Sequence, residues 1–361
     1  MHQVMVIGAG KIGSLITVLL CHSNDYTVHL ADMHQKIPYE RRLKDLKNFN
    51  YVMIDATDMN ALSSYVKKNH ITTIISSLPF YYNATIATIA AENQIHYFDL
   101  TEDVTTTKTV IEISKNASSA FVPQCGLAPG FISIVSHDLM KHFPSLDTVK
   151  MRVGALPINI SNALQYSLTW STDGLINEYG NPCYAIENGQ LVTLQPLEGL
   201  EEIKVDGLTY EAFNTSGGIG SLAETYYGKV KHISYKTIRY PGHCEKIKFL
   251  MNDMKLNSER ETLKHIFERA IPKTYQDVVL VYVSVTGTKD DHYIEENYVK
   301  KFYSKKIGSH RWSAIQLTTA SNLCCVVDIV LNNPSQYRGF IRQEQFSLED
   351  ILNNRFGGCF K

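Results

Sequence analysis

The chain has 361 residues, of which 44% are hydrophobic and 20% are charged, and its formal net charge is −1. This length exceeds what one hydrophobic core usually supports, so we expect two domains. The balanced charge argues against a nucleic-acid partner, which would need a basic surface, and no apolar run reaches the ~20 residues of a membrane span. We therefore expect a small-molecule ligand, with no nucleic acid and no membrane as partner.

The N-terminus and the cysteines predict a cytoplasmic protein. Met1-His2-Gln3 leads directly into an apolar run, without the basic segment and the small-residue cleavage site of a signal peptide. The seven cysteines are irregularly spaced and form no CxxC pair, so we expect neither a disulfide framework nor a zinc site. No other metal site is predicted.

The first motif is a glycine-rich turn between a strand and a helix. Residues 4–7 are apolar and rich in β-branched side chains, which predicts a buried parallel strand. Gly8-Ala9-Gly10-Lys11-Ile12-Gly13 follows, and residues 14–20 have a helical pattern. In this context GxGxxG predicts a dinucleotide site. The glycines allow a tight turn, close approach of a pyrophosphate and close helix–strand packing, and the helix N-terminus attracts phosphate.

Asp32 predicts which dinucleotide binds. It ends a second predicted strand over residues 27–31 and lies 19 residues after Gly13. A carboxylate at this place accepts hydrogen bonds from the ribose hydroxyls and repels a 2′-phosphate. Neither Met33 nor His34 is an arginine, so the sequence favours NAD over NADP.

Strands and helices alternate over the first 130 residues, which predicts an α/β domain with a doubly wound parallel sheet of the Rossmann type. Strands are expected at residues 51–54, 73–76, 96–100 and 120–124, and helices at residues 59–68, 83–93 and 108–116. The ligand crevice of such a sheet lies at the carboxyl ends of its strands. The side chains expected there are Asp32, Ser76, Ser77, Leu78, Asp99 and Cys125.

The pattern changes after Gly130, where strands become longer and less regularly paired with helices. Strands are expected at residues 150–154, 165–169, 232–239, 278–286 and 293–302, and helices at residues 131–142, 246–254 and 259–270. This predicts an α+β substrate domain with a mixed sheet over residues 131–310. An apolar helix over residues 312–331 opens the last segment, 311–361. We expect that segment to return to the first domain, so that the second is an insertion.

Later motifs resemble the saccharopine dehydrogenase family, and within it the NAD-dependent lysine 6-dehydrogenases. The resemblance runs nearly end to end. Besides GxGxxG it rests on Tyr97-Phe98-Asp99-Leu100, Gly126-Leu127-Ala128-Pro129-Gly130, Leu168-Thr169-Trp170-Ser171, Thr215-Ser216-Gly217-Gly218, Thr237-Ile238-Arg239-Tyr240-Pro241-Gly242-His243 and Asn354-Arg355-Phe356-Gly357. The resemblance implies reversible hydride transfer at a carbon that bears an amine, on a small amino-acid substrate. It also makes a homodimer or larger homo-oligomer expected.

The implied reaction needs a cation for the substrate carboxylate and a base for its amine, because an ammonium group cannot release hydride. Arg239 is expected to clamp the carboxylate with two parallel hydrogen bonds; a structural salt bridge is the alternative. His243 is the leading base because its ordinary pKa lies near neutrality, with a capping or core histidine as the alternative. Asp99 is a second candidate for base or amine ligand, with helix capping as its alternative.

The remaining candidates are predicted from their neighbours in the chain. Backbone groups around Cys125, Gly126 and Pro129 are expected to bind substrate or nicotinamide, with the Cys125 side chain filling space rather than acting as a nucleophile. Thr215-Ser216 belongs to a flexible turn that is expected to order over the substrate, with a simple loop as the alternative. Trp170 is expected to form an apolar wall, and a core tryptophan is the alternative.

Three functions stay open at this point. The first is oxidation of a primary amine of lysine or a related amino acid, followed by imine hydrolysis and release of ammonia. The second is reductive carbon–nitrogen chemistry, as in saccharopine reductases and carboxynorspermidine dehydrogenases; a second arginine near the substrate would favour it, because those substrates carry more carboxylates. The third is a dinucleotide-binding sensor without turnover.

Overall fold

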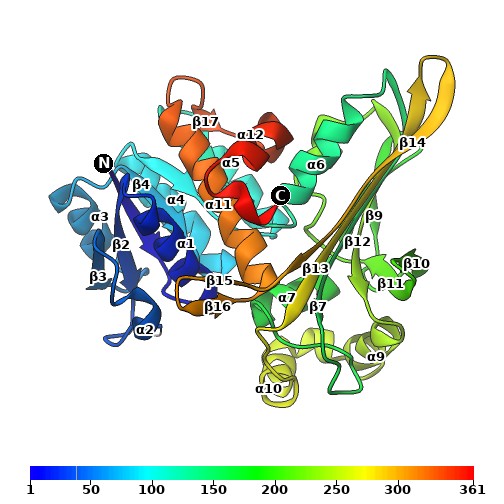
Figure 1. The fold of residues 1–361 in the computed structure, drawn as a ribbon, viewed down its shortest axis with the longest axis horizontal. Helices are drawn as coiled ribbons and strands as arrows, with labels where there is room; N and C mark the ends of the chain where they lie inside the picture. Colours follow the sequence, from blue (N-terminus) through cyan, green and yellow to red (C-terminus); the bar gives the residue numbers. More distant parts are fainter. Residues whose placement is uncertain (38) are drawn as a thin grey trace. The chain divides into compact units, whose positions relative to one another are not determined.

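The computed structural model describes residues 1–37 and 39–361 and divides into two compact units (Figure 1). The first unit comprises Met1–Gly130 and Gln316–Lys361, and the second comprises Phe131–Ile315. Along the chain, the second unit is therefore an insertion into the first.

The first unit contains a sheet with the strand order β17-β6-β5-β4-β1-β2-β3, in which all neighbours are parallel. The order runs outward from β1 in both directions, which is the doubly wound arrangement of Rossmann domains. This confirms the predicted fold class. The strands are β1 (His2–Ile7), β2 (Tyr26–Asp32), β3 (Phe49–Met53), β4 (Thr73–Ser76), β5 (His96–Phe98), β6 (Ala120–Val122) and β17 (Gly339–Phe340). The helices are α1 (Lys11–His22), α2 (Glu40–Leu43), α3 (Met59–Lys68), α4 (Asn83–Glu92), α5 (Val104–Ser114) and α12 (Leu348–Asn353).

Local sequence explains where these elements begin. All four residues of β4 are buried, as expected for a parallel strand covered on both faces. The carboxylate of Asp58 accepts the N–H of Ala61 at 2.9 Å and so caps α3. Asp103 caps α5 in the same way, accepting the N–H of Thr106 at 2.6 Å. Because of this cap, α5 begins at Val104, four residues before the predicted start at residue 108.

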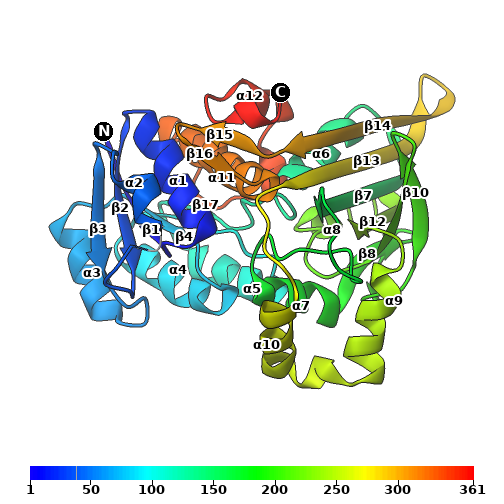
Figure 2. The ribbon, with the colours of Figure 1, turned by 60° about the horizontal axis from the view of Figure 1, so that its bottom comes forward.

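The second unit contains an eight-stranded mixed sheet with the order β10-β11-β12-β7-β13-β14, in which β8 pairs with β12 and β9. Among the described strand pairs of this second sheet, only β12 and β7 are parallel. Figure 2 shows β7, β13 and β14 running side by side. The strands are β7 (Ser145–Pro157), β8 (Cys183–Glu187), β9 (Gln190–Leu194), β10 (Glu201–Val205), β11 (Leu208–Asn214), β12 (Val230–Arg239), β13 (Asp277–Lys289) and β14 (His292–Tyr303), with a separate hairpin β15 (Lys305–Ile307) and β16 (His310–Trp312). The helices are α6 (Phe131–Met140), α7 (Thr172–Gly180), α8 (Leu222–Thr225), α9 (His243–Lys248) and α10 (Arg260–Ala270).

Two predicted elements of this unit are wrong or shifted. Residues 165–169 form no strand, since Gln165 has a φ of 53° and Leu168 donates its N–H to a distant loop carbonyl at 2.8 Å. Their apolar side chains pack instead into a core cluster under α7 and α10. The helix expected at 246–254 begins earlier, as α9, and continues as a single π-helical turn over Phe249–Asp253.

The long apolar helix α11 (Ala314–Asn332) begins at a buried carboxylate. Asp277 accepts the N–H groups of Ala314 and Ile315 at 2.6 and 3.0 Å and so caps the helix. By length and composition alone α11 could cross a membrane, which corrects the expectation that no apolar segment is long enough. In the structure, 83% of the most apolar 18-residue stretch of α11 is buried, as in a core helix of a globular protein.

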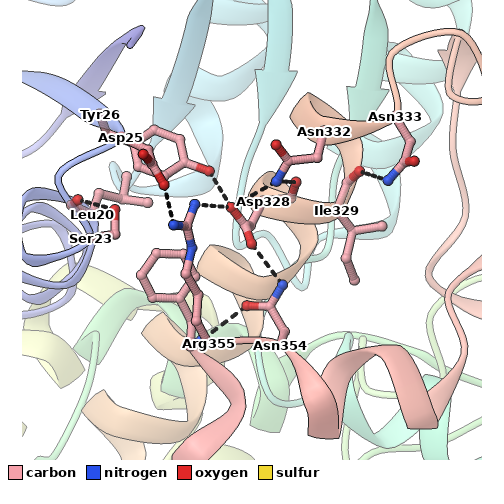
Figure 3. Close-up of polar contacts among 11 residues, drawn as sticks. Leu20, Ser23, Asp25, Tyr26, Asp328, Ile329, Asn332, Asn333, Asn354 and Arg355 are labelled. Carbon is pink, nitrogen blue, oxygen red and sulfur yellow. Dashed lines mark hydrogen bonds and ion pairs between the residues drawn. The ribbon is translucent and has the colours of Figure 1, made fainter.

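A polar cluster joins the C-terminal segment to the start of β2, as Figure 3 shows. The carboxylate of Asp328 on α11 accepts the Tyr26 hydroxyl at 2.6 Å and the side-chain amides of Asn332 and Asn354 at 3.1 and 2.9 Å. It also forms an ion pair with Arg355 at 2.5 Å. The last residues of the chain are therefore fixed to the Rossmann sheet by buried polar contacts.

Candidate cofactor and substrate sites

The turn between β1 and α1 has the geometry that a dinucleotide needs. A Cβ atom on Gly8, whose φ is +102°, would lie 2.9 Å from the carbonyl oxygen of Ser77. A Cβ atom on Gly13 would lie 1.9 Å from the carbonyl oxygen of Gly8, so both positions require glycine. A Cβ atom on Gly10 would meet no atom within 4 Å, which leaves open space where a pyrophosphate approaches the backbone.

Helix α1 follows this turn with an N-terminus that suits an anion. Within the described residues no side chain caps Gly10, and the first turn, which contains Lys11 and Ile12, holds no acidic residue. The N–H groups of that turn and the helix dipole therefore favour a bound phosphate. The residues present thus fit a dinucleotide.

Two of the three predicted residues at the carboxyl end of β4 lie against the turn. Ser77 donates its N–H to the carbonyl oxygen of Ile7 at 2.8 Å, and the Leu78 side chain lies 3.1 Å from the place of a Cβ on Gly8. Ser76 is buried and donates its hydroxyl to the side chain of Asn83 on α4 at 2.6 Å. Its contact is therefore with the helix that follows rather than with the turn.

Asp32 uses both carboxylate oxygens within the protein. Oδ2 accepts the N–H of Ala9 at 2.8 Å, and Oδ1 lies 3.1 Å from the N–H and 2.7 Å from Nδ1 of His34. Burial alone would raise the pKa of Asp32, but these hydrogen bonds outweigh it and hold the pKa below its ordinary value. The carboxylate therefore holds the glycine-rich turn in place.

Asp99 is fully buried at the carboxyl end of β5. One oxygen accepts the Tyr97 hydroxyl at 2.6 Å, and the other accepts the N–H groups of Thr101 and Gln124 at 2.9 and 3.0 Å. Burial raises the pKa of Asp99 despite these bonds. The contacts join the ends of β5 and β6, so they favour a structural role; a role as base or amine ligand stays a prediction.

The segment after β6 forms a tight turn that α11 holds. Gly126 and Gly130 bridge across the turn, which carries Pro129. The side-chain amide of Asn322 donates to the carbonyl oxygens of Cys125 and Gly126, both at 3.0 Å. Burial raises the pKa of the Cys125 thiol, which is consistent with a space-filling group.

In the second unit, Arg239 ends β12 and is only 3% exposed. Its Nε donates to the Tyr179 hydroxyl at 2.9 Å and its Nη1 to the carbonyl oxygen of Ile238 at 2.9 Å. The guanidinium lies 5.0 Å from the centre of the Tyr166 ring. The remaining nitrogen, Nη2, lies 3.9 Å from Oε2 of Glu178, which is too long for a hydrogen bond. Two nitrogens of this cation are thus fixed by the protein and the third faces an acid.

His243 is buried next to Tyr179, the same residue that Arg239 contacts. Its Nδ1 lies 2.7 Å from the carbonyl oxygen of Leu164, and its Nε2 lies 3.0 Å from the Tyr179 hydroxyl. A carbonyl oxygen only accepts, so Nδ1 carries the proton and neutral Nε2 accepts from Tyr179. Burial, together with the charge of Arg239, lowers the pKa of His243 to about 3. These contacts favour a role in orienting Tyr179 over the predicted role of base, which stays a prediction.

The other predicted substrate residues lie near this cluster. Trp170 donates its indole N–H to the Tyr166 hydroxyl at 3.2 Å. Ser216 donates its N–H to the carbonyl oxygen of Glu178 at 2.9 Å and its hydroxyl to Pro182 at 3.0 Å. Thr215 is 2% exposed. The Thr215-Ser216 segment is thus packed against α7, unlike the flexible turn that was expected.

Sequence reasoning missed the two tyrosines that connect these residues. The chain has 21 tyrosines, so Tyr166 and Tyr179 are not conspicuous one by one. The available signal was position in the sequence: Tyr179 directly follows Glu178, and Tyr166 lies four residues before Trp170.

The strand order, the glycine-rich turn and the uncapped helix place the protein among dinucleotide-binding enzymes with a Rossmann domain. Two family models match the chain: the saccharopine dehydrogenase NADP binding domain over residues 4–122 and the saccharopine dehydrogenase C-terminal domain over residues 126–356. The chain belongs to the saccharopine dehydrogenase family, a family of oxidoreductases.

Named relatives are distant. The mitochondrial alpha-aminoadipic semialdehyde synthase of Rattus norvegicus is 20% identical over 308 residues, which cover 81% of this chain and 32% of that protein. The saccharopine dehydrogenase [NADP(+), L-glutamate-forming] of Schizosaccharomyces pombe is 22% identical over 264 residues, 70% of this chain and 58% of that protein. The chain therefore spans 32% and 58% of the lengths of these two relatives. The apo saccharopine dehydrogenase (L-Glu forming) of Saccharomyces cerevisiae has the same fold, with a TM-score of 0.77, 15% identity and coverage of 97% and 95% of the two chains.

The expected preference for NAD is wrong. The matching N-terminal family model is that of an NADP-binding domain, and the S. pombe relative is named for NADP(+). The inference failed at Asp32, because it assumed a carboxylate free to bind ribose hydroxyls and repel a 2′-phosphate. Both oxygens are instead engaged by Ala9 and His34.

Proposed function

We propose that the protein is an NADP-dependent dehydrogenase that oxidises the side-chain primary amine of lysine or a close relative. The observation that carries this proposal is the buried pair of Arg239 and Glu178 in the second unit. Family membership and the NADP-binding family model support the reaction class and the cofactor.

The pair suits the α-amino-acid group of such a substrate. Nη2 of Arg239 can donate to an α-carboxylate, while Glu178 can accept from an α-ammonium group. Glu178 is 7% exposed and lies 3.9 Å from Arg239, so both charges are held in a site with little water. One cation and one anion match a zwitterion better than a singly charged molecule.

The tyrosine and histidine of the cluster would then orient the substrate amine. The Tyr179 hydroxyl accepts from Arg239 and donates to His243. Because the tautomer of His243 is fixed by Leu164, this hydroxyl has a single orientation. Such an oriented hydroxyl can accept a hydrogen bond from the substrate amine and so position it, while the amine itself must bind in its neutral form.

The reaction balances as follows. The carbon that bears the amine gives up a hydride and the nitrogen releases a proton to solvent, which leaves an imine that water hydrolyses to an aldehyde and ammonia. An NADP⁺ held by the turn from Gly8 to Gly13 would supply the hydride acceptor. The exposed His34 and Lys36, which follow Asp32, are the residues that we expect to meet its 2′-phosphate.

The second candidate is oxidation of saccharopine, a larger substrate with more carboxylates, and the names of the relatives favour it. Its extra carboxylates would need further cations. The other buried arginine among the described residues of this unit, Arg152, is already bonded to Glu201 at 2.5 Å and to the carbonyl of Ser234 at 2.8 Å. A single available buried arginine therefore supports the smaller substrate.

The test is the rate of NADPH formation by the purified protein with NADP⁺ and either L-lysine or saccharopine. We expect turnover with lysine accompanied by ammonia. Arg239→Gln should raise the KM for lysine at least ~10-fold, the loss of about 1.4 kcal/mol or more of binding. Arg152→Gln is the matched control, and it should leave the KM unchanged. Turnover with saccharopine alone would establish the second candidate. NADPH binding without turnover of either substrate would indicate a sensor and overturn the proposal.

A further inference from the structure

β14 forms one edge of the mixed sheet in the second unit. It is 12 residues long and pairs with β13 over its whole length. Within the described chain no other strand pairs with it, and Figure 2 shows it along that edge of the sheet. A typical strand has about 5–6 residues, and an edge strand presents a row of N–H and C=O groups that another strand can bind. An exposed edge of this length can therefore pair with a strand of another molecule.

The sequence of β14 is complementary to itself when it is read in opposite directions about Tyr298. In an antiparallel pair of two copies centred on this residue, Glu295 lies opposite Lys301 and Glu296 lies opposite Lys300. The two-fold axis repeats both pairs. Every acid of the strand thus faces a base of the other copy.

The outer positions of the same register are also compatible. They place side chains of similar character opposite one another, namely Tyr293 with Tyr303 and Ile294 with Phe302. Tyr293 and Tyr303 are 65% and 52% exposed, so large apolar surfaces lie at both ends of the strand. Aromatic pairs directly across two strands stabilise a sheet.

Backbone geometry permits this register and disfavours its neighbours. Alternate residues of a strand turn their N–H and C=O groups to the same side, so residues that face each other across a shared edge must both have even or both have odd numbers. An axis through Tyr298 satisfies this condition. An axis through Asn297 or Val299 would leave no acid opposite a base, and an axis through Glu296 or Lys300 would place like charges together.

Contacts within one chain already distribute the charges over the two faces of the strand. Glu296 accepts from His142 at 2.6 Å and from Lys289 at 3.0 Å on one face. Lys301 pairs with Asp206 at 2.9 Å on the other. Because paired residues share a face, one set of Glu–Lys pairs would form on each side of the joined sheet.

We propose that two copies of this chain associate edge to edge through β14, antiparallel and with the two-fold axis at Tyr298. The interface is isologous, as in most homodimers, and it makes one continuous sheet from the two mixed sheets. Mixed charges on an edge strand can also serve to keep other strands away. Charges that only repel other strands need not be complementary to a second copy of the same strand. In the antiparallel register about Tyr298, both acids and both bases of β14 lie opposite a residue of the other sign.

Charge reversal tests the register. The variant Glu295→Lys/Glu296→Lys and the variant Lys300→Glu/Lys301→Glu each place like charges across the axis, so each should weaken dimerisation at least tenfold in analytical ultracentrifugation. Mixed one to one, the two variants should form a heterodimer, because their strands are again complementary. The variant with all four reversals should dimerise like the wild type. Far-UV circular dichroism confirms that each variant is folded.

A cross-link tests the axis directly. Tyr298→Cys places a thiol opposite its own copy, so oxidation should give a disulfide-linked dimer. Tyr303→Cys is the control, because its two copies would lie about 34 Å apart at ~3.4 Å per residue. A monomeric wild type, reversal variants that dimerise as well as the wild type, or cross-linking at 303 but not at 298 would each overturn the proposal. The readouts do not involve turnover, so they stand apart from the proposed reaction.

Discussion

Replacing Asp328 by alanine should strongly destabilise the first unit. The carboxylate is 6% exposed and receives hydrogen bonds from Tyr26, Asn332 and Asn354 as well as the ion pair with Arg355. Removing the carboxylate leaves the donors of Tyr26 and Asn354 without this acceptor, at about 1–3 kcal/mol each, while Arg355 is 38% exposed and keeps its pair with Asp25. Native proteins are stable by only about 5–15 kcal/mol, so the variant should lose a large part of its stability.

Urea denaturation followed by circular dichroism measures the effect, and limited proteolysis should show earlier cleavage in the C-terminal segment. Asp25→Ala is the matched control. Asp25 also pairs with Arg355, but it is exposed, so the denaturation midpoint should stay near that of the wild type. An Asp328→Ala protein as stable as the wild type would show that the cluster in Figure 3 contributes little to the anchoring of the C-terminal segment.

Three further predictions concern the turn, a cap and a buried histidine. Gly10→Ala should fold normally but bind NADPH at least ~10-fold more weakly in a fluorescence titration. Gly13→Ala should also lower the thermal stability, because its Cβ would lie 1.9 Å from the carbonyl oxygen of Gly8. If both variants bound NADPH as tightly as the wild type, the proposed cofactor site would be refuted. Asp277→Ala should lower the free energy of unfolding by about 1–2 kcal/mol in urea, as expected for the loss of the α11 cap, and no change would contradict that role. His243 has a folded pKa of about 3 and an ordinary value of 6.5, so the unfolded chain binds a proton first. The wild type should therefore lose up to ~1.4 kcal/mol per pH unit as the pH falls between these values, and His243→Gln should lose less.

The sequence predicted the first unit well because its signals are local. Strand, glycine turn and helix follow one another within residues 2–22, and Gly13 is required by the carbonyl oxygen of Gly8 in the same turn. The caps of α3 and α5 also lie within three residues of the groups that they bind. Such features can be read without knowing the rest of the fold.

The second unit was harder because its strands are defined by distant partners. Residues 165–169 alternate like a strand, yet they pack as an irregular segment against side chains from α7 and α10. The strand expected at 150–154 is part of β7, which extends from Ser145 to Pro157 because β12 and β13 flank it. A single window of sequence contains none of these neighbours.

In the candidate sites, too, the sequence predicted the positions of residues better than their contacts with distant parts of the chain. Arg239 and His243 come from one motif, and Trp170 and Ser216 come from two others. The structure brings the three motifs to one cluster around Tyr166 and Tyr179. The prediction of NAD was wrong because hydrogen bonds within the protein engage the Asp32 carboxylate. Asp32 was placed correctly at the end of β2, but nothing in the sequence shows that Ala9 and His34 engage its oxygens.

The most direct test of the proposed function follows the hydride itself. The protein is incubated with NADP⁺ and L-lysine that carries deuterium on its side-chain terminal carbon, and the reduced cofactor is examined by mass spectrometry. We predict that the NADPH carries one deuterium and that the reaction is slower than with unlabelled lysine. NADPH without deuterium, or no NADPH from lysine under conditions where the protein binds the cofactor, would contradict oxidation at that carbon.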